Sequence, residues 1–538
     1  MAWLDGVDDR RLQVIWNGID GRAYRVRHTH QVGLAQVLHT VEELVGAAAG
    51  HHCTAPVQAI ILFGRKAIKG ECESKSSRPV SLPLVSSSVL TQPAELSRRK
   101  MGVVDQQEVE VVESCMVKPS EETPSHGLWL SQLDLKMVNR GHTPNVYFYS
   151  PDSGDVDNFF DVARLKAAMA KALVPFYPLA GRLGADGDGR PEIDCAGQGV
   201  LFVVARSDLT VDGFVDFQPS PELRRLFVPR VEDSPSIMCA IQVTFMGCGG
   251  VALGTALHHV AIDAVSAVHF FQTWSGFCRD GDAAAAVLEL PCHDRTLLCA
   301  RSPPVVHPDA LTVFSCPKLS LAVSAEPSGA VVNKIFVLSK DQVAALKRAC
   351  TSGGDGGRVS TFCAVSAQVW RSFCTAGRLP TDATTRLTFP ANIRGALRPP
   401  LPARYFGNGI IVLGAACKVR DIESEELGSV AHRISGAVRR MDDELVRSAI
   451  DYLEIHGSKQ PPSSMPETEL RVVSWLGMPV YDTDFGWGKP LVMHRAVQQR
   501  AGMVYLMDGV SGSGGVRILV STEAAILNDF QHLLYANF

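Results

Sequence analysis

The sequence lacks the features that would place this chain outside the cell or in a membrane. No apolar run approaches the roughly 18 residues of a membrane-spanning helix, and the opening MAWLDGVDDRRLQ shows no basic segment followed by an apolar one. The 14 cysteines contain no CxxC pair, which favours free thiols in a reducing compartment over a disulfide framework. We therefore expect a cytoplasmic protein.

A surplus of positive charge is also absent. The chain has 52 Lys and Arg against 56 Asp and Glu, which gives a formal net charge of −4. This charge balance does not predict binding to a nucleic acid or an anionic membrane, which would require an excess of basic residues. The glycine-rich SGSGGV at 511–516 lacks the Lys-Ser/Thr of a nucleotide-binding P-loop and predicts a tight hairpin instead. The expected ligand is a small molecule.

The 538 residues divide into an atypical N-terminal stretch and a longer part with regular patterns. Residues 1–100 end in a segment rich in Ser, Pro and basic residues without periodicity, which predicts a disordered extension; Met101 is a candidate for the true start of translation. The remainder is long enough for two cores. We expect one domain at 101–300 and another at 326–538, joined by a proline-rich crossover at 301–325.

From residue 101 onward, short apolar or alternating runs typical of strands are interspersed with helical patterns. The strand-like runs are 145–150, 199–205, 241–257, 333–339, 386–393 and 409–416, and the helical ones are 161–173, 340–352 and 426–456. This mixture predicts the α/β class, a mixed α+β arrangement with sheets covered by helices.

One apolar run, LGTALHHVAIDAV, carries three ionisable residues, His258, His259 and Asp263. Three interpretations are open from these residues alone. The histidines could be core residues satisfied by backbone carbonyls; His and Asp four residues apart on a helix could bind a metal, although no third ligand or HExxH motif is nearby; or a histidine of near-neutral pKa could act as an acid or base.

A second stretch near the C-terminus, Asp484-Phe485-Gly486-Trp487-Gly488, has two glycines flanking a tryptophan. With the HxxxD of His259 and Asp263 upstream, this DFGWG string resembles the plant BAHD acyl-CoA-dependent acyltransferase family, whose two signatures occur in that order. Segments at 165–183, 242–259, 294–298 and 398–410 also resemble the family. The resemblance covers about 108–538.

The resemblance implies a fold of two similar chloramphenicol-acetyltransferase-like domains with a solvent channel between them. Acyl-CoA would enter the channel from one side, as a co-substrate, and the acceptor from the other. The resemblance further implies a monomer with no bound cofactor and no metal site.

The resemblance also assigns roles to residues. His259 would be the general base that deprotonates the acceptor without a covalent acyl-enzyme, and Asp263 would pair with an arginine, for which Arg394 is the candidate. Trp475 would lie beside the reacting carbonyl, where an indole N–H could help hold the oxyanion, although core packing is an equal alternative. Asp484, Phe485, Gly486, Trp487 and Gly488 would shape the channel structurally. Ala264, where the family often has glycine, and Asn392, where many members have aspartate, are mild departures.

The donor is suggested by GHTPNVYFY at 141–149, which resembles a segment of hydroxycinnamoyltransferases that surrounds the donor ring. His142, Asn145 and Tyr147 are the corresponding residues, and His258 would lie among them. A p-coumaroyl, caffeoyl or feruloyl thioester is therefore expected, with benzoyl as an alternative.

The acceptor is suggested by an absence. Members that use shikimate or quinate carry an arginine for the acceptor carboxylate, whereas 455–473 offers Lys459 and no arginine before Arg471. Gly477 stands where those members tend to have arginine, and the segment SWLGMP resembles the corresponding segment of polyamine and amine N-acyltransferases. We expect an amine acceptor (putrescine, agmatine, spermidine or an aromatic amine), with O-acylation of an alcohol, a catalytically silent binding protein and a metal-dependent hydrolase as alternatives.

Overall fold

The computed structural model divides the chain into two compact units, Met1–Gly102 and Val103–Phe538. It describes residues 12–17, 23–28, 58–63, 66–71 and 109–536, apart from 152–157, 215–217, 309, 311–330, 352–357, 458–466, 497–499 and 510–513.

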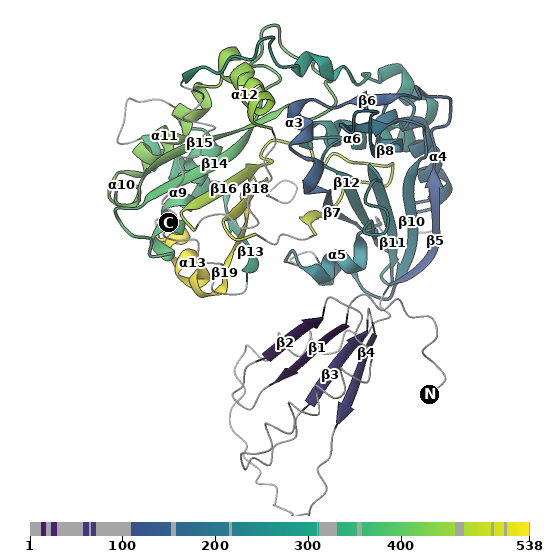
Figure 1. Cartoon of the computed structure of the whole chain (residues 1–538), viewed down its shortest axis with the longest axis horizontal. Coiled ribbons are helices and arrows are strands. Elements are labelled where there is room, and N and C mark those ends of the chain that lie inside the picture. Colours follow the sequence, from purple (N-terminus) through teal and green to yellow (C-terminus); the bar gives the residue numbers. More distant parts are fainter. Residues whose placement is uncertain are drawn as a thin grey trace, which may run out of the picture. The chain divides into compact units, whose positions relative to one another are not determined.

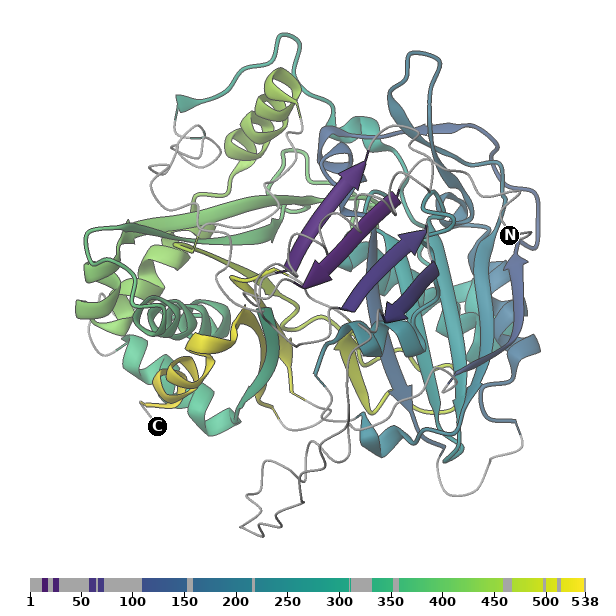
Figure 2. The same ribbon diagram turned by 60° about the horizontal axis from the view of Figure 1, so that its bottom comes forward.

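In the first unit, the described residues form an antiparallel sheet of four strands in the order β2-β1-β3-β4 (Figure 2). The strands are β1 (Leu12–Asn17), β2 (Ala23–His28), β3 (Gln58–Phe63) and β4 (Lys66–Glu71). The other residues of 1–100 lie outside the described ranges, and the expected disorder stays a prediction for them.

The first half of the second unit is built on a six-stranded sheet in the order β17-β7-β12-β11-β10-β5 (Figure 1). Its strands are β5 (Glu110–Val117), β7 (His142–Tyr149), β10 (Val200–Ser207), β11 (Cys239–Met246), β12 (Val251–His258) and β17 (Val492–Arg495). A small sheet has the order β6 (Gly127–Trp129), β9 (Pro191–Asp194) and β8 (Arg182–Ala185). The helices of this half are α3 (Gln132–Leu135), α4 (Val162–Ala172), α5 (Pro221–Phe227) and α6 (Ala264–Asp280).

Both faces of this sheet are covered. Successive residues of a strand point to opposite faces, and every residue of β12 is buried. In β7, Val146 and Phe148 belong to the apolar cluster that contains residues of α5. Tyr147 and Tyr149, the intervening residues, belong to the cluster that contains residues of α4 and α6.

The second half has another six-stranded sheet, in the order β13-β19-β18-β16-β14-β15. Its strands are β13 (Val331–Leu338), β14 (Thr384–Asn392), β15 (Ile410–Lys418), β16 (Glu469–Ser474), β18 (Met503–Asp508) and β19 (Val516–Glu523). Its helices are α8 (Lys340–Thr351), α9 (Thr361–Ala376), α10 (Val419–Ser424), α11 (Leu427–Arg439), α12 (Asp443–His456) and α13 (Leu527–Tyr535). Short 3-10 helices complete the unit: η1 (Val138–Arg140), η2 (Tyr177–Ala180), η3 (Val211–Gly213), η4 (Gly281–Val287), η5 (Arg295–Leu298) and η6 (Ala524–Ile526).

The two halves share a strand. After β16, the chain leaves the second sheet, pairs β17 antiparallel with β7 of the first sheet, and returns as β18 (Figure 1). The predicted α/β class is confirmed. Strands β18 and β19, on either side of 511–516, are antiparallel neighbours, but residues 510–513 lie outside the described ranges, so the tight turn expected there stays a prediction. Most of the expected crossover at 301–325 lies outside the described residues. None of the described helices has the length and apolar character needed to cross a membrane.

Candidate active site

The predicted catalytic residues lie where β12 passes into α6. Strand β12 ends at His258, His259 opens a turn, and α6 begins at Ala264. Asp263 is the N-cap of this helix, because its carboxylate accepts a hydrogen bond from the Ser266 N–H at 2.9 Å. His259 therefore precedes the helix, and the two residues do not share one helix face, as the metal hypothesis required.

Asp263 is held by the predicted arginine. Arg394 Nη1 lies 2.7 Å from Asp263 Oδ2 and Nη2 lies 3.0 Å from Oδ1, so the guanidinium donates a two-pronged pair of hydrogen bonds. Both side chains are buried, and the Gly409 N–H donates to Oδ2 at 2.9 Å. This pair ties the start of α6 in the first half to the end of β14 in the second.

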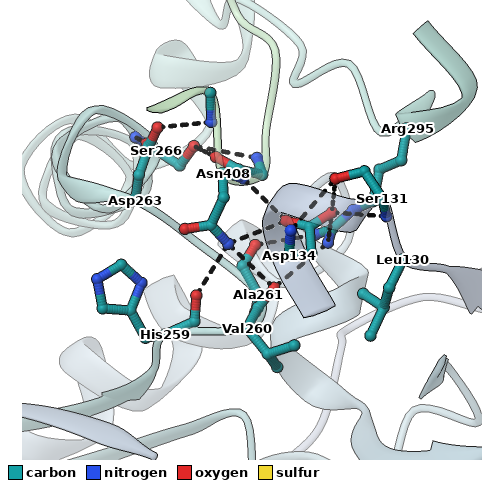
Figure 3. Close-up of polar contacts among 12 residues, drawn as sticks. Leu130, Ser131, Asp134, His259, Val260, Ala261, Asp263, Ser266, Arg295 and Asn408 are labelled. Atoms are coloured by element: carbon teal, nitrogen blue, oxygen red, sulfur yellow. Dashed lines mark hydrogen bonds and ion pairs between the residues drawn. The ribbon is translucent and has the colours of Figure 1, made fainter. Parts of the chain in front are cut away.

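A second buried pair, which the sequence interpretation missed, holds the turn itself. Asp134 Oδ2 lies 2.9 Å from Arg295 Nη1, and Asp134 Oδ1 accepts from the Asn408 backbone N–H at 3.0 Å and from its amide Nδ2 at 2.9 Å. Figure 3 shows Asn408 between this carboxylate and the turn.

All three carbonyls of the turn are bound by this network. Asn408 Nδ2 donates to the carbonyl oxygens of His259 at 2.9 Å and Val260 at 3.2 Å. Arg295 Nη2 donates to the Ala261 carbonyl at 2.9 Å. The His259 N–H in turn donates to the Gly141 carbonyl at 2.9 Å, so the backbone of His259 is fixed on both sides.

The imidazole of His259 points away from these contacts (Figure 3). Burial first, and then the guanidinium of Arg140, lower the pKa of His259, and against the opposing charge of Asp263 the pKa comes to about 4. Among the described residues, its buried Nδ1 has no hydrogen-bond partner. The ring is therefore neutral near pH 7 and able to accept a proton.

The other residues predicted at the substrates lie on neighbouring strands. His258 pairs in register with His142, and their ring centroids are 4.9 Å apart. Burial lowers the pKa of His258 to about 3, and its Nδ1 accepts from the Val260 N–H at 3.2 Å, which fits a core histidine. His142 Nε2 lies 2.6 Å from the Ile237 carbonyl oxygen. Asn145 Oδ1 lies 3.4 Å from Arg495 Nη1.

Trp475 lies in the loop after β16 and is half-buried. Its ring is 5.5 Å from that of Tyr505, edge to face, and the Arg495 guanidinium carbon lies 6.0 Å from its centroid. Tyr147 is buried, and this burial raises the pKa of its phenol. The predicted roles of these side chains at the substrates stay predictions.

The DFGWG segment packs away from the histidine. Phe485 is buried edge to face against Trp274, 4.6 Å between centroids, and Trp487 stacks on Phe160 at 5.3 Å. Because Trp274 is ten residues into α6, it lies about 15 Å along the helix from Ala264. Asp484 Oδ1 closes the loop by accepting from the N–H groups of Gly486 and Gly488, at 2.8 and 3.0 Å. These contacts support the structural role expected of the segment.

Sequence reasoning missed the residues that act on His259 through long-range contacts. Asp134, Arg295 and Asn408 lie far apart along the chain, although 294–298 and 398–410 resemble family segments. The only local signal was the pattern of Ser131 and Asp134, which form a reciprocal capping box at the N-terminus of α3. Arg140 and Arg495, whose charges act on His259, could not be singled out among 52 basic residues.

Comparisons with known proteins show what the chain is similar to. A sequence model of the Transferase family matches residues 107–536. Putrescine hydroxycinnamoyltransferase 1 of Oryza sativa subsp. japonica is 46% identical over 447 residues, which cover 79% of this chain and 98% of that protein. Shikimate O-hydroxycinnamoyltransferase of Nicotiana tabacum is 40% identical over 441 residues, covering 79% of this chain and 99% of its own.

Two further matches add an acceptor class and a fold. A hydroxycinnamoyl-CoA:5-hydroxyanthranilate N-hydroxycinnamoyltransferase of Avena sativa is 37% identical over 450 residues, with 79% of this chain and 99% of that protein covered. The crystal structure of vinorine synthase superposes with a TM-score of 0.63 at 25% identity, covering 80% of this chain and 98% of the other.

Proposed function

Because the chain belongs to the Transferase family, that of the BAHD acyl-CoA-dependent acyltransferases, we propose that it transfers a hydroxycinnamoyl group from its CoA thioester to an amine. That it is an acyltransferase follows from the family, which uses acyl-CoA as co-substrate. The observation that carries the chemistry is the neutral imidazole of His259 on a turn whose carbonyls are all bound.

The reaction needs one base and no covalent intermediate. The acceptor nitrogen attacks the thioester carbonyl carbon while His259 Nε2 takes the proton from that nitrogen. The tetrahedral intermediate then collapses, the C–S bond breaks, and the CoA thiolate takes the proton back from His259. The products are an amide and free CoA.

The donor and acceptor are supported by the relatives. Three of them act, by their names, with hydroxycinnamoyl groups, and two of those three transfer to a nitrogen. The second candidate is O-acylation of a hydroxy acid, favoured by the shikimate-using relative. The lack of an arginine at 455–470 is weak evidence against that candidate, because Arg140 and Arg495 bring positive charge to His259 from other elements. A cytoplasmic, monomeric enzyme stays a prediction.

The test is an assay of the purified full chain with p-coumaroyl-CoA and a panel of amines and alcohols, followed by mass spectrometry of the products. We expect amide formation, and a fall in kcat of about 100- to 10,000-fold in His259→Ala. His269→Asn is the matched control, because this buried histidine of α6 lies 2.9 Å from the Glu289 carbonyl oxygen through its Nε2 and should affect stability more than kcat. Ester formation on shikimate with no amide would favour the second candidate, and an absence of any transfer would overturn the proposal.

A further inference from the structure

Arg495, on β17, is a buried arginine with few partners. It is 8% exposed, and its Nη1 donates one long hydrogen bond, of 3.4 Å, to Oδ1 of Asn145 on β7. This is the only hydrogen bond that the guanidinium makes among the described residues, and its buried Nε has no partner there. Because a buried guanidinium is costly unless it is paired, Arg495 has donors available for a ligand.

Two aromatic side chains of the second half pack against this guanidinium. Its central carbon lies 5.2 Å from the ring centroid of Tyr505, on β18, and 6.0 Å from that of Trp475, after β16. The two rings meet edge to face at 5.5 Å. Aromatic rings and guanidinium planes both stack on a flat ring, so this group of side chains suits an aromatic ligand that carries a polar atom.

The strand pairing places Asn145 and Arg495 on the face of the first sheet where the two halves meet. The two residues are opposite each other in the register of β7 and β17. Because side chains alternate along a strand, they share a face with Tyr147 and Met493, two residues away on each strand. The apolar cluster of Tyr147 and Met493 also contains Tyr505 of the second sheet.

The distance from the catalytic histidine along β7 matches a hydroxycinnamoyl group. The His259 N–H donates to the carbonyl of Gly141, which directly precedes β7, and Asn145 lies about 13 Å further along the extended chain. Ordinary bond lengths put the phenol oxygen of a hydroxycinnamoyl group about 8 Å from its carbonyl carbon. With that carbon about 3.5 Å from the base, the phenol oxygen comes within reach of Asn145 and Arg495.

We propose that Arg495 and Asn145 bind the phenol oxygen of the donor, so that the enzyme selects acyl groups with a free para-hydroxyl. This inference rests on the proposed hydroxycinnamoyl transfer. The phenol oxygen accepts a hydrogen bond from the guanidinium of Arg495 and donates its proton to Oδ1 of Asn145, which has a second lone pair. The ring of the donor lies against Tyr505 and Trp475.

This pair of hydrogen bonds discriminates between donors. A cinnamoyl group has no hydroxyl and would leave the buried guanidinium without a partner, and sites built to bind a hydroxyl reject such analogues strongly. A 4-methoxycinnamoyl group keeps the acceptor oxygen but has no proton for Asn145. A benzoyl group lacks both the hydroxyl and the vinyl spacer, so it would reach neither side chain.

The donor suits this group of side chains better than the acceptor does. Every hydroxycinnamoyl donor brings an aromatic ring with a hydroxyl, whereas putrescine, agmatine and spermidine have no ring. Putrescine is therefore the acceptor with which the donors are best compared, because it offers nothing that could stack on Trp475 and Tyr505.

The test compares p-coumaroyl-CoA, cinnamoyl-CoA and 4-methoxycinnamoyl-CoA as donors to putrescine, with the full chain. We expect the kcat/KM of the native chain to be highest with p-coumaroyl-CoA. In Arg495→Met its preference over cinnamoyl-CoA should fall by about tenfold to 100-fold, as for loss of a hydrogen bond to a charged group. Arg495→Lys, which keeps the charge but not the planar fork, should lie between. Asn145→Leu should reduce the preference over 4-methoxycinnamoyl-CoA. Each ratio is measured on one preparation, so a smaller folded fraction cancels.

Arg517→Gln is the matched control, because Arg517 is also buried, at 5% exposed, and donates to the Met493 carbonyl of β17 at 3.3 Å. It should lower stability and leave the donor preference unchanged. Equal kcat/KM of the native chain for p-coumaroyl-CoA and cinnamoyl-CoA would overturn the inference, whatever the variants do, and leave the proposed function in place.

A parallel series with tyramine separates the donor from an aromatic acceptor. If Arg495→Met raises the KM of tyramine and leaves the donor preference unchanged, these side chains bind the acceptor and the inference is wrong. No amide with either acceptor and any donor would overturn the proposed function itself.

Discussion

His259 is kept neutral by its surroundings rather than by a bound partner. Burial disfavours the charged imidazolium first, and the guanidinium groups of Arg140 and Arg495 disfavour it further, while Asp263 acts in the opposite direction. Asp263 cannot offset the burial, because Arg394 neutralises its charge within hydrogen-bond distance. The base form is therefore available throughout the neutral range, without a carboxylate partner of the kind found in a catalytic triad.

This arrangement predicts the acidic limb of the pH profile. An ordinary histidine would lose its base form as pH falls through about 6.5, whereas the pKa of His259 is lowered to about 4. We therefore expect kcat/KM, expressed per concentration of unprotonated amine, to stay level until pH approaches 4. In Arg140→Gln the limb should move to higher pH, since a cation that opposes protonation is gone. A native profile that falls near pH 6.5 would contradict the burial of this ring. Arg206→Gln, which changes an exposed arginine of β10, serves as the control.

At the scale of elements, the active-site turn is held by side chains that come from other elements. Neither β12 nor α6 fixes the three turn carbonyls; Asn408, from the loop before β15, and Arg295, from η5, do so. Both donors are oriented by the single carboxylate of Asp134. Three remote segments therefore meet at one turn, and a change in any of them should reach the catalytic ring.

Asn408→Ala tests this arrangement. The variant loses the amide donor to the carbonyls of His259 and Val260. We expect the free energy of unfolding to fall by about 1 to 3 kcal/mol, because a buried acceptor is left without a partner. We also expect a loss of kcat that is larger than the change in KM. Gln242→Ala removes a buried amide of β11 that bonds to Leu226 and Thr244 instead, and it should lower stability without the selective loss of kcat. Equal effects of the two variants on kcat would show that Asn408 has no special role in positioning the base.

The DFGWG loop depends on a backbone conformation that favours glycine. Gly486 has a φ of +99°, and a Cβ built on it would lie 2.8 Å from Nη2 of Arg164. We expect Gly486→Ala to lower the free energy of unfolding by about 1 to 3 kcal/mol, measured by urea denaturation. Gly187→Ala, at a site with open space and no positive φ, is the control. A Gly486→Ala variant as stable as this control would show that the loop can change its path.

The sequence predicted strands from short apolar runs and helices from patterns with one apolar face. The apolar run 145–150 became part of β7, and the pattern at 161–173 corresponds to α4. Helix α9 was not predicted, because 12 of its 16 residues are buried and leave no polar face to reveal a helical period. Helix α6 was not predicted either. The Asp263–Arg394 pair was predicted through the family resemblance. Asn408 was not, since its contacts depend on how distant segments meet.

At the scale of the whole molecule, Val103–Phe538 behaves as one structure rather than two separable domains. Strand β17 comes from the second half of the sequence and pairs with β7 of the first. The pair of Asp263 with Arg394 and the contacts of Asn408 with His259 also join the two halves. The active-site turn belongs to the first half but is complete only when the second half is in place.

The described active-site contacts all come from one of the two units. Every contact of His259 described above comes from Val103–Phe538, and the family match begins at residue 107. We therefore expect a chain that begins at Met101 to fold and to show the same kcat/KM and the same acceptor preference as the full chain. A chain that begins at Pro144 is the contrasting variant, because it lacks Asp134 and Arg140 and should be inactive. Loss of activity in the Met101 chain, with far-ultraviolet circular dichroism unchanged, would assign the N-terminal unit a part in catalysis that the active-site contacts do not require.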